Sequence, residues 1–461
     1  MHKYLTPAVG KLFLVAGLLS AISIAQGQAQ DSGPADDAPL DLSHYQGPGM
    51  VSPGVGNIGE GSGRVNSFAI FGSVNGLYDS FLQTSQTDSK GNLVSNTGAL
   101  SMEAGGGITG TRLAKRGKLG VDYRGSVRYY PSSDGQNGSD QTAKFGYTLQ
   151  ATRRLILDFK ALGGTYVYGV SGPGSLLTSD ASSGLGASAQ LFDSRVNYLR
   201  GLTSATVKRG ARMFITFGGG ANLFAPTGAG LNRTHGYDAN ASVTRRMSRN
   251  SNIGMSYQYS RMEFPSTSGR SNVHAIQASY STLFDRFWRF SIDAGASIVD
   301  IQNNVTIVVN PALVPFFGPT LTFRNVNKSI YPSGTISLTR SFKTSAVSIS
   351  YLRGITSGNG LFTTSRQEAF NAQSSYSGFR RVGLGADVSY GKLIALSQSV
   401  GGYGTYSVGG FGSYALGRGV RLRARYDFRH QTVDTNSYLR NGSRVLFGVE
   451  YVKNEVPLPV Y

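Results

Sequence analysis

The chain has 461 residues, no cysteine and a formal net charge of +19. The absence of cysteine excludes a disulfide framework and a thiolate metal site. Such a charge suggests nucleic acid in a soluble protein, but the cations are dispersed and no nucleic-acid-binding motif is present, so we expect no nucleic-acid partner. Glycine is abundant at 62 residues, beside 25 tyrosines, 24 phenylalanines and only 15 prolines. This composition is typical of curved strands with interfacial aromatic residues.

Residues 1–29 have the pattern of a secretory signal peptide. Lys3 and Lys11 give a positive start, an apolar stretch follows, and small residues precede the cleavage site. We predict cleavage after Ala29, with Ala25 as the alternative. The apolar stretch is short of the ~20 residues that a spanning helix needs, which disfavours an N-terminal membrane anchor.

Residues 30–64 are rich in glycine, proline and aspartate and predict a flexible periplasmic segment. From residue 65 onward no domain boundary is visible. We predict one domain over 65–453, followed by a short tail over 454–461. No later segment is a long enough apolar run for a second helical span.

A basic pair or near pair returns along this domain roughly every 38 residues, a period that fits two strands, one short turn and one longer loop. Two intervals are longer and place extra length in 169–193 and 303–327. The sites are Lys115-Arg116, Arg153-Arg154, Lys208-Arg209, Arg245-Arg246, Asp285-Arg286, Arg340 to Lys343, Arg380-Arg381 and Gly417-Arg418. This repeat predicts the hairpins of an up-and-down transmembrane β-barrel.

Apolar and polar residues alternate between these sites, as they do in strands with two different faces. In 420–430, Leu422, Ala424 and Tyr426 alternate with arginines. The same alternation occurs in 118–130, 144–152, 286–299, 381–390 and 444–452. The pattern predicts an all-β, antiparallel fold.

We predict 18 strands, with 16 as the alternative because 169–207 and 357–379 are the least regular stretches. An even number leaves both termini on one side, with short periplasmic turns and longer outer loops. The predicted spans are 65–82, 98–112, 118–130, 141–152, 155–168, 194–207, 211–224, 234–246, 251–263, 271–283, 286–302, 328–340, 344–357, 366–379, 381–391, 402–416, 419–431 and 441–453.

These features together resemble a Gram-negative outer-membrane β-barrel of porin type. The matching features are the leader, the hairpin period, strands rich in tyrosine and glycine, and the aromatic final strand over 445–451. The resemblance implies residence in the cell outer membrane, contact with its lipid and lipopolysaccharide, and insertion by the barrel-assembly machinery. By analogy with trimeric porins, it also implies a homo-trimer and a third outer loop, 169–193, that narrows the lumen.

Two features depart from that pattern. The chain runs on through 454–457 after the last aromatic strand, whereas barrels of this class usually end there. Constriction loops of porins usually carry several acidic residues, and here Asp180 and Asp193 are the only two.

No catalytic constellation is recognisable. His235, His274 and His430 fall at the outer ends of predicted strands, but no fixed motif joins them to a nucleophile or a base. The glycine runs at 105–107 and 218–220 lack a following helical pattern and indicate bends in strands rather than nucleotide loops. We therefore predict no enzyme, no cofactor and no metal site.

The polar strand faces predict the lining of the lumen. The expected cations are Lys118, Arg124, Arg128, Lys144, Lys160, Arg289, Arg421, Arg423, Arg425, Arg429 and Arg444. The expected anions are Asp122, Asp158, Asp293, Asp387, Asp427 and Glu450. These charges either pair across neighbouring strands and only solvate the wall, or they leave a positive excess that favours anions.

The pattern predicts an outer-membrane channel for passive diffusion of small hydrophilic solutes, anionic or neutral, with a weak preference for anions. One alternative is an exporter of an acidic polysaccharide, which the row of Arg421, Arg423 and Arg425 would suit. Another is a non-channel barrel with a structural or adhesive role. An open lumen distinguishes the first hypothesis from the third.

Overall fold

The computed structural model describes most of the region after residue 66. The described ranges are 67–80, 98–131, 137–167, 195–227, 232–285, 287–308, 320–342, 344–357, 363–376, 378–396, 401–417, 419–433 and 438–457. The predicted signal peptide, the segment 30–64 and the loop 169–193 lie outside these ranges. Within them, no helix is long and apolar enough to cross a membrane.

The described residues form one closed sheet of 18 antiparallel strands, which confirms the predicted fold class and makes the alternative of 16 strands wrong. The strands are β1 (Ser67–Asp79), β2 (Ala99–Ala114), β3 (Gly117–Tyr129), β4 (Gly138–Gln150), β5 (Leu155–Val167), β6 (Arg195–Lys208), β7 (Met213–Pro226), β8 (Thr234–Arg246), β9 (Ser251–Phe264), β10 (Gly269–Leu283), β11 (Trp288–Val308), β12 (Thr320–Ser341), β13 (Ser345–Thr356), β14 (Ser365–Tyr376), β15 (Val382–Ala395), β16 (Gly402–Gly417), β17 (Val420–Val433) and β18 (Tyr438–Pro457).

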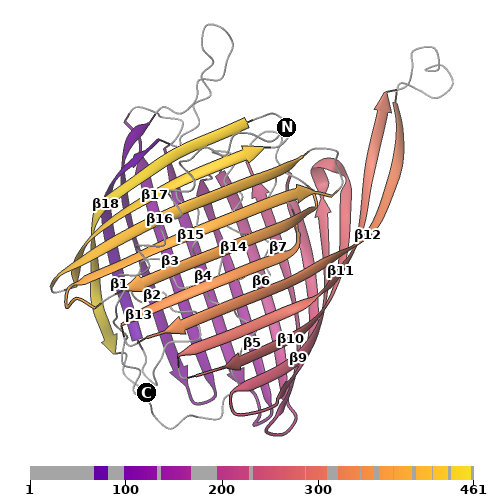
Figure 1. Cartoon of the computed structure of the whole chain (residues 1–461), viewed down its shortest axis with the longest axis horizontal. Helices are drawn as coiled ribbons and strands as arrows, with labels where there is room; N and C mark the ends of the chain where they lie inside the picture. The colour runs from indigo at the N-terminus through magenta and orange to yellow at the C-terminus, as the bar shows by residue number, and fades with distance from the viewer. Residues whose placement is uncertain are drawn as a thin grey trace.

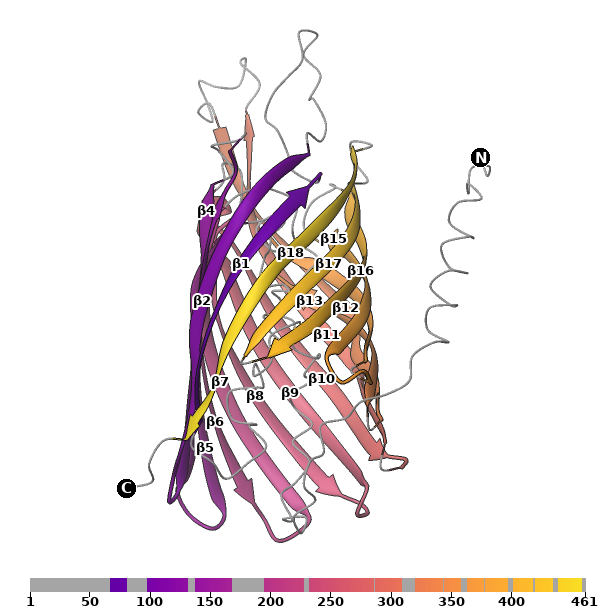
Figure 2. The ribbon, with the colours of Figure 1, turned by 90° about the vertical axis from the view of Figure 1, so that its left-hand side faces the viewer.

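Each strand pairs with its sequence neighbours, and the sheet closes where the first strand meets the last (Figure 1). On β1, Asn75 is opposite Glu103 of β2 on one side and Gly448 of β18 on the other. Figure 2 shows β18 lying between β17 and β1 at this seam. Because the sheet has no free edge, its backbone groups are satisfied internally, as a hydrocarbon environment requires.

The two faces of the sheet differ in the sense expected for a barrel surrounded by lipid. On β3, Val127 is 62% exposed and Tyr129 is 55% exposed, whereas Asp122 and Arg128 are each 3% exposed. The same alternation places large apolar side chains on the outside of the other strands. On strands such as β3, apolar side chains therefore face outward and charged ones face the interior, the reverse of a soluble protein.

Aromatic residues form a row on the outward face. Tyr351, Phe370, Tyr390 and Tyr406 are successive register partners along β13 to β16, and each is 36–44% exposed. Tyr414 faces outward further along β16, eight positions from Tyr406. Eight residues span about 27 Å along a strand, or about 21 Å along the normal at a tilt of about 40°. The two tyrosines therefore bracket an apolar band close to the ~25 Å of known membrane barrels.

The basic pairs lie at the ends of the strands that short turns connect. Lys115 and Arg116 separate β2 from β3, and Arg380 and Arg381 separate β14 from β15. Backbone hydrogen bonds join several of these turns to the neighbouring hairpin: Gln150 N at the end of β4 donates to Arg116 O in the β2–β3 turn over 2.7 Å. At the opposite end, β9 and β10 are joined by the short 3-10 helix η4 (Pro265–Thr267).

The hairpin of β11 and β12 is longer than the sequence pattern predicts. Residues 303–327 were expected to form a loop, yet Asn303 to Val308 pairs with Thr320 to Asn325 and carries the hairpin beyond its neighbours (Figure 1). The prolines at 311, 315 and 319, which suggested a loop, lie outside the described residues.

The last strand also extends past its predicted end at 453. Residues up to Pro457 pair with the start of β1, since Ser67 is opposite Pro457 and Phe68 is opposite Val456. The tail predicted over 454–461 is therefore partly strand. The extension supplies a pairing partner for the first residues of β1. No alternation of apolar and polar residues in this segment predicts it.

Candidate pore lining

All eleven cations predicted for the lumen fall on the strand face opposite the exposed apolar residues. They alternate with outward side chains such as Tyr123, Phe145 and Tyr426. Their part in lining an open pore stays a prediction. The residues are Lys118, Arg124, Arg128, Lys144, Lys160, Arg289, Arg421, Arg423, Arg425, Arg429 and Arg444.

Sequence reasoning missed several charged residues on the same inner face. They are Arg200 among the cations, and Asp79, Glu103, Asp140 and Asp238 among the anions. Arg200 shares its face with Tyr198 and Leu202, so no polar alternation marks it. The additional anions make the inner wall more mixed in charge than the sequence pattern suggests.

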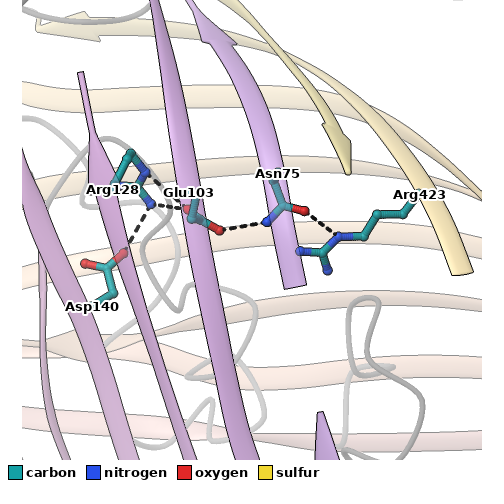
Figure 3. A network of polar contacts seen from close by, with 5 residues as sticks. All are labelled: Asn75, Glu103, Arg128, Asp140 and Arg423. Atoms are coloured by element: carbon teal, nitrogen blue, oxygen red, sulfur yellow. Dashed lines mark hydrogen bonds and ion pairs between the residues drawn. The ribbon is translucent and has the colours of Figure 1, made fainter. Parts of the chain in front are cut away.

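One network of polar contacts runs around the wall through five strands (Figure 3). Arg128 on β3 donates to Glu103 on β2 at 2.7 Å and lies 3.4 Å from Asp140 on β4. Asn75 on β1 donates to Glu103 at 3.3 Å, and Arg423 on β17 donates to Asn75 at 3.0 Å. Each charged side chain in this network therefore has a polar partner on another strand of the barrel wall.

A second cluster joins three adjacent strands on the C-terminal side. Arg425 on β17 contacts Asp427 of the same strand at 2.6 Å and Asp387 of β15 at 2.9 Å. Its side chain crosses β16 at Gly409, which is opposite both Asp387 and Asp427. An added Cβ at Gly409 would lie 2.9 Å from Arg425 Nη2, so only glycine leaves room for this crossing.

Other contacts cross a strand at a glycine in the same way. Thr142 Oγ1 on β4 and Tyr198 OH on β6 lie 2.9 Å apart, and both are opposite Gly164 of β5. Gln277 on β10 donates to Ser333 on β12 at 3.4 Å, with Gly295 of β11 opposite both. Glycine on an inner face therefore lets polar side chains two strands apart meet.

The three arginines expected to form a ladder have different surroundings. Arg425 is shared between two carboxylates, and Arg423 donates to the neutral amide of Asn75. Arg421 is opposite Glu450 in register, and among the described residues it forms no ion pair. Positive charge is therefore less compensated at Arg421 and Arg423 than at Arg425.

The three histidines face outward and contact separate partners. His235 Nε2 lies 3.0 Å from Glu263 Oε2, and His274 Nδ1 lies 2.8 Å from the Tyr257 hydroxyl. His430 contacts Asn441 and stacks on Tyr406. Within the described ranges, no group of three or more His, Asp or Glu side chains is arranged to hold a metal ion.

A closed antiparallel sheet of 18 strands, apolar outside and charged inside, defines a porin-like β-barrel of the outer-membrane class. No protein-family model matches the chain, and no curated protein sequence is significantly similar to it. The strand pairings of this chain establish its architecture.

Solved structures of other barrels superpose on most of the chain at low identity. OpdQ of Pseudomonas aeruginosa is 12% identical, with 86% of this chain and 98% of that chain covered and a TM-score of 0.42. OccAB4 of Acinetobacter baumannii is 11% identical, with 85% and 98% covered and a TM-score of 0.39. The ferric-catecholate import receptor Fiu of E. coli is 8% identical, with 84% and 82% covered and a TM-score of 0.43.

Proposed function

We propose that this protein is an outer-membrane channel for the passive diffusion of small hydrophilic solutes, with a weak preference for anions. The observation that supports it is the closed sheet of 18 strands whose inner face carries charged side chains. Barrels of 16 to 18 strands are too wide for side chains to fill and leave an aqueous passage.

The proposed preference for anions rests on how the inner charges are paired. Within the described ranges, Arg289, Arg421 and Arg423 form no ion pair with a carboxylate, whereas Arg444 is opposite Asp79 and Asp427 in register. In contrast, Arg128 and Arg425 each contact two carboxylates. Uncompensated cations in a narrow aqueous passage raise the local concentration of anions. The preference is weak because the wall also carries many acids.

The experiment is single-channel conductance of the refolded protein in a planar bilayer under a salt gradient. We expect discrete steps and a reversal potential on the chloride side. The double variant R421Q/R423Q should move the reversal potential toward zero, because both substitutions remove inward cations. The matched control R153Q/R154Q removes two cations of the β4–β5 turn and should leave it almost unchanged.

Three outcomes would count against the proposal. Absence of conductance from a barrel that shows normal heat-modifiable migration would favour the polysaccharide exporter or a structural barrel. A reversal potential on the cation side would overturn the anion preference while keeping the channel. Equal shifts in both double variants would show that the arginines at 421 and 423 have no special part in selectivity.

Export and assembly belong to the same proposal. We expect the mature chain in the outer-membrane fraction after removal of residues 1–29, inserted by the barrel-assembly machinery. N-terminal sequencing of the fractionated protein tests the cleavage site. Chemical cross-linking in the membrane tests the homo-trimer proposed by analogy. Recovery of the monomer alone after cross-linking would contradict it.

A further inference from the structure

Three cations surround one carboxylate on the outward face of β13, β14 and β15. Arg353, Glu368 and Lys392 are direct register partners on these three strands, and Arg366 lies two positions from Glu368 on the same face. They lie near the strand ends opposite the short basic turns. The group therefore carries two more positive charges than negative ones.

The position of this group relative to the membrane follows from its neighbours in register. Two residues further along each strand, toward the short basic turns, lie Tyr351, Phe370 and Tyr390, which are 37%, 36% and 44% exposed. Side chains alternate along a strand, so residues two positions apart share a face. Aromatic girdles mark the level where the hydrocarbon ends and the headgroups begin. The three cations are therefore at the level of lipid headgroups.

The single carboxylate does not satisfy the two guanidinium groups. Arg366 Nε lies 3.4 Å and Arg353 Nε lies 3.7 Å from the same oxygen of Glu368. Both Nε atoms are shielded from solvent and have no hydrogen-bond partner in the described part of the structure. A buried N–H without an acceptor is costly, so an acceptor supplied from outside would be bound favourably.

A second charged group on the outward face provides a contrast. On β9, Arg261 Nη2 lies 2.6 Å from Glu263 Oε1, and the other oxygen of Glu263 lies 3.0 Å from His235 Nε2. There each oxygen of the carboxylate has its own close partner. Of these two groups, only the one on β13–β15 has a surplus of cations and guanidinium N–H groups without a hydrogen-bond partner.

We propose that Arg353, Arg366 and Lys392 bind a phosphate group of lipopolysaccharide in the outer leaflet. Guanidinium forks and an ammonium group are the side chains that best match phosphate oxygens. The site opens toward the lipid face and not toward the lumen, so its ligand is a membrane component. This inference needs the protein to reside in the outer membrane, but it does not need the lumen to conduct.

The test measures the lipopolysaccharide that stays bound to protein extracted from outer membranes in mild detergent, by native mass spectrometry. We expect R353Q/R366Q to retain about tenfold less than the natural sequence, a factor that corresponds to about 1.4 kcal/mol. The matched control R380Q/R381Q removes two arginines from the turn at the opposite end of the β14–β15 hairpin. It should retain as much as the natural sequence.

A second measurement does not depend on a folded variant. The natural protein, stripped of lipid, is titrated with lipid A that carries its phosphates and with lipid A that has been enzymatically dephosphorylated. We expect only the phosphorylated form to bind tightly. Equal binding of both forms, equal retention by both double variants, or retention of glycerophospholipid in place of lipopolysaccharide would each overturn the proposal.

Discussion

Arg423 on β17 donates a hydrogen bond from Nε to Oδ1 of Asn75 on β1 over 3.0 Å, although β18 lies between these strands. Gly448 is the residue of β18 opposite both partners, and its lack of a side chain leaves the path across the strand open. This contact joins the beginning and the end of the barrel domain at the seam where the sheet closes.

Replacing Gly448 with alanine should weaken the seam. An added Cβ would lie 2.6 Å from Val74 O and 2.9 Å from the Cα atom of Asn75, which are backbone atoms that do not rotate away. We expect the free energy of unfolding to fall by about 1–3 kcal/mol. The temperature at which the folded band disappears on a semi-native gel measures this change.

Gly354→Ala is the control for that experiment. Gly354 lies on the inner face of β13, where an added Cβ meets nothing within 4 Å. Its transition temperature should match that of the natural protein. Equal loss in both variants would mean that the effect comes from glycine replacement in general and not from the closure of the sheet.

The Asp387→Asn substitution should increase the preference for anions. Asp387 lies 2.9 Å from Arg425 Nη2, and the substitution removes one of the carboxylates that contact this cation, while Asp427 stays in contact at 2.6 Å. The wall then gains one unit of positive charge, so the reversal potential under a salt gradient should move further toward that of chloride. Asp285→Asn, in the turn after β10, is the control. A shift toward the cation side for Asp387→Asn would contradict this account.

Glu103 and Arg128 should show a strong energetic coupling. Arg128 is 3% exposed and donates to Glu103 at 2.7 Å, with Asp140 more distant at 3.4 Å. Glu103→Gln alone leaves a buried cation with less compensation, and we expect it to cost about 1–3 kcal/mol. A double-mutant cycle with Arg128→Gln, measured by urea unfolding in lipid vesicles, gives the coupling energy. Additive effects would show that the contact contributes nothing.

Removal of the projecting part of the β11–β12 hairpin should leave the barrel intact. The β10 pairing of β11 ends at Gln302, and the β13 pairing of β12 begins at Gly334. In the described part of the hairpin, 303–308 and 320–325 therefore pair only with each other. A variant in which an Asn-Gly turn replaces 303–325 should keep heat-modifiable migration and its conductance. Loss of folding would mean that the hairpin contributes to assembly of the sheet.

The number of strands and their orientation were accessible from the sequence. The span predicted over 234–246 has the same bounds as β8, and the alternation over 420–430 assigned each arginine of β17 to the inner face. Strong alternation with a period of two is visible locally because each strand separates lipid from the interior. Prediction was poorer where pairing continues without such contrast, as in β12 and at the end of β18.

The sequence by itself determined the strand period, the two faces and the short basic turns, because these depend on residues close together along the chain. Only the tertiary structure decided which side chains meet, such as Arg423 with Asn75, and Arg353 and Arg366 around Glu368. Alternation specifies the face of a residue, but the register between neighbouring strands specifies its partners. That register is set when all 18 strands pair and the sheet closes.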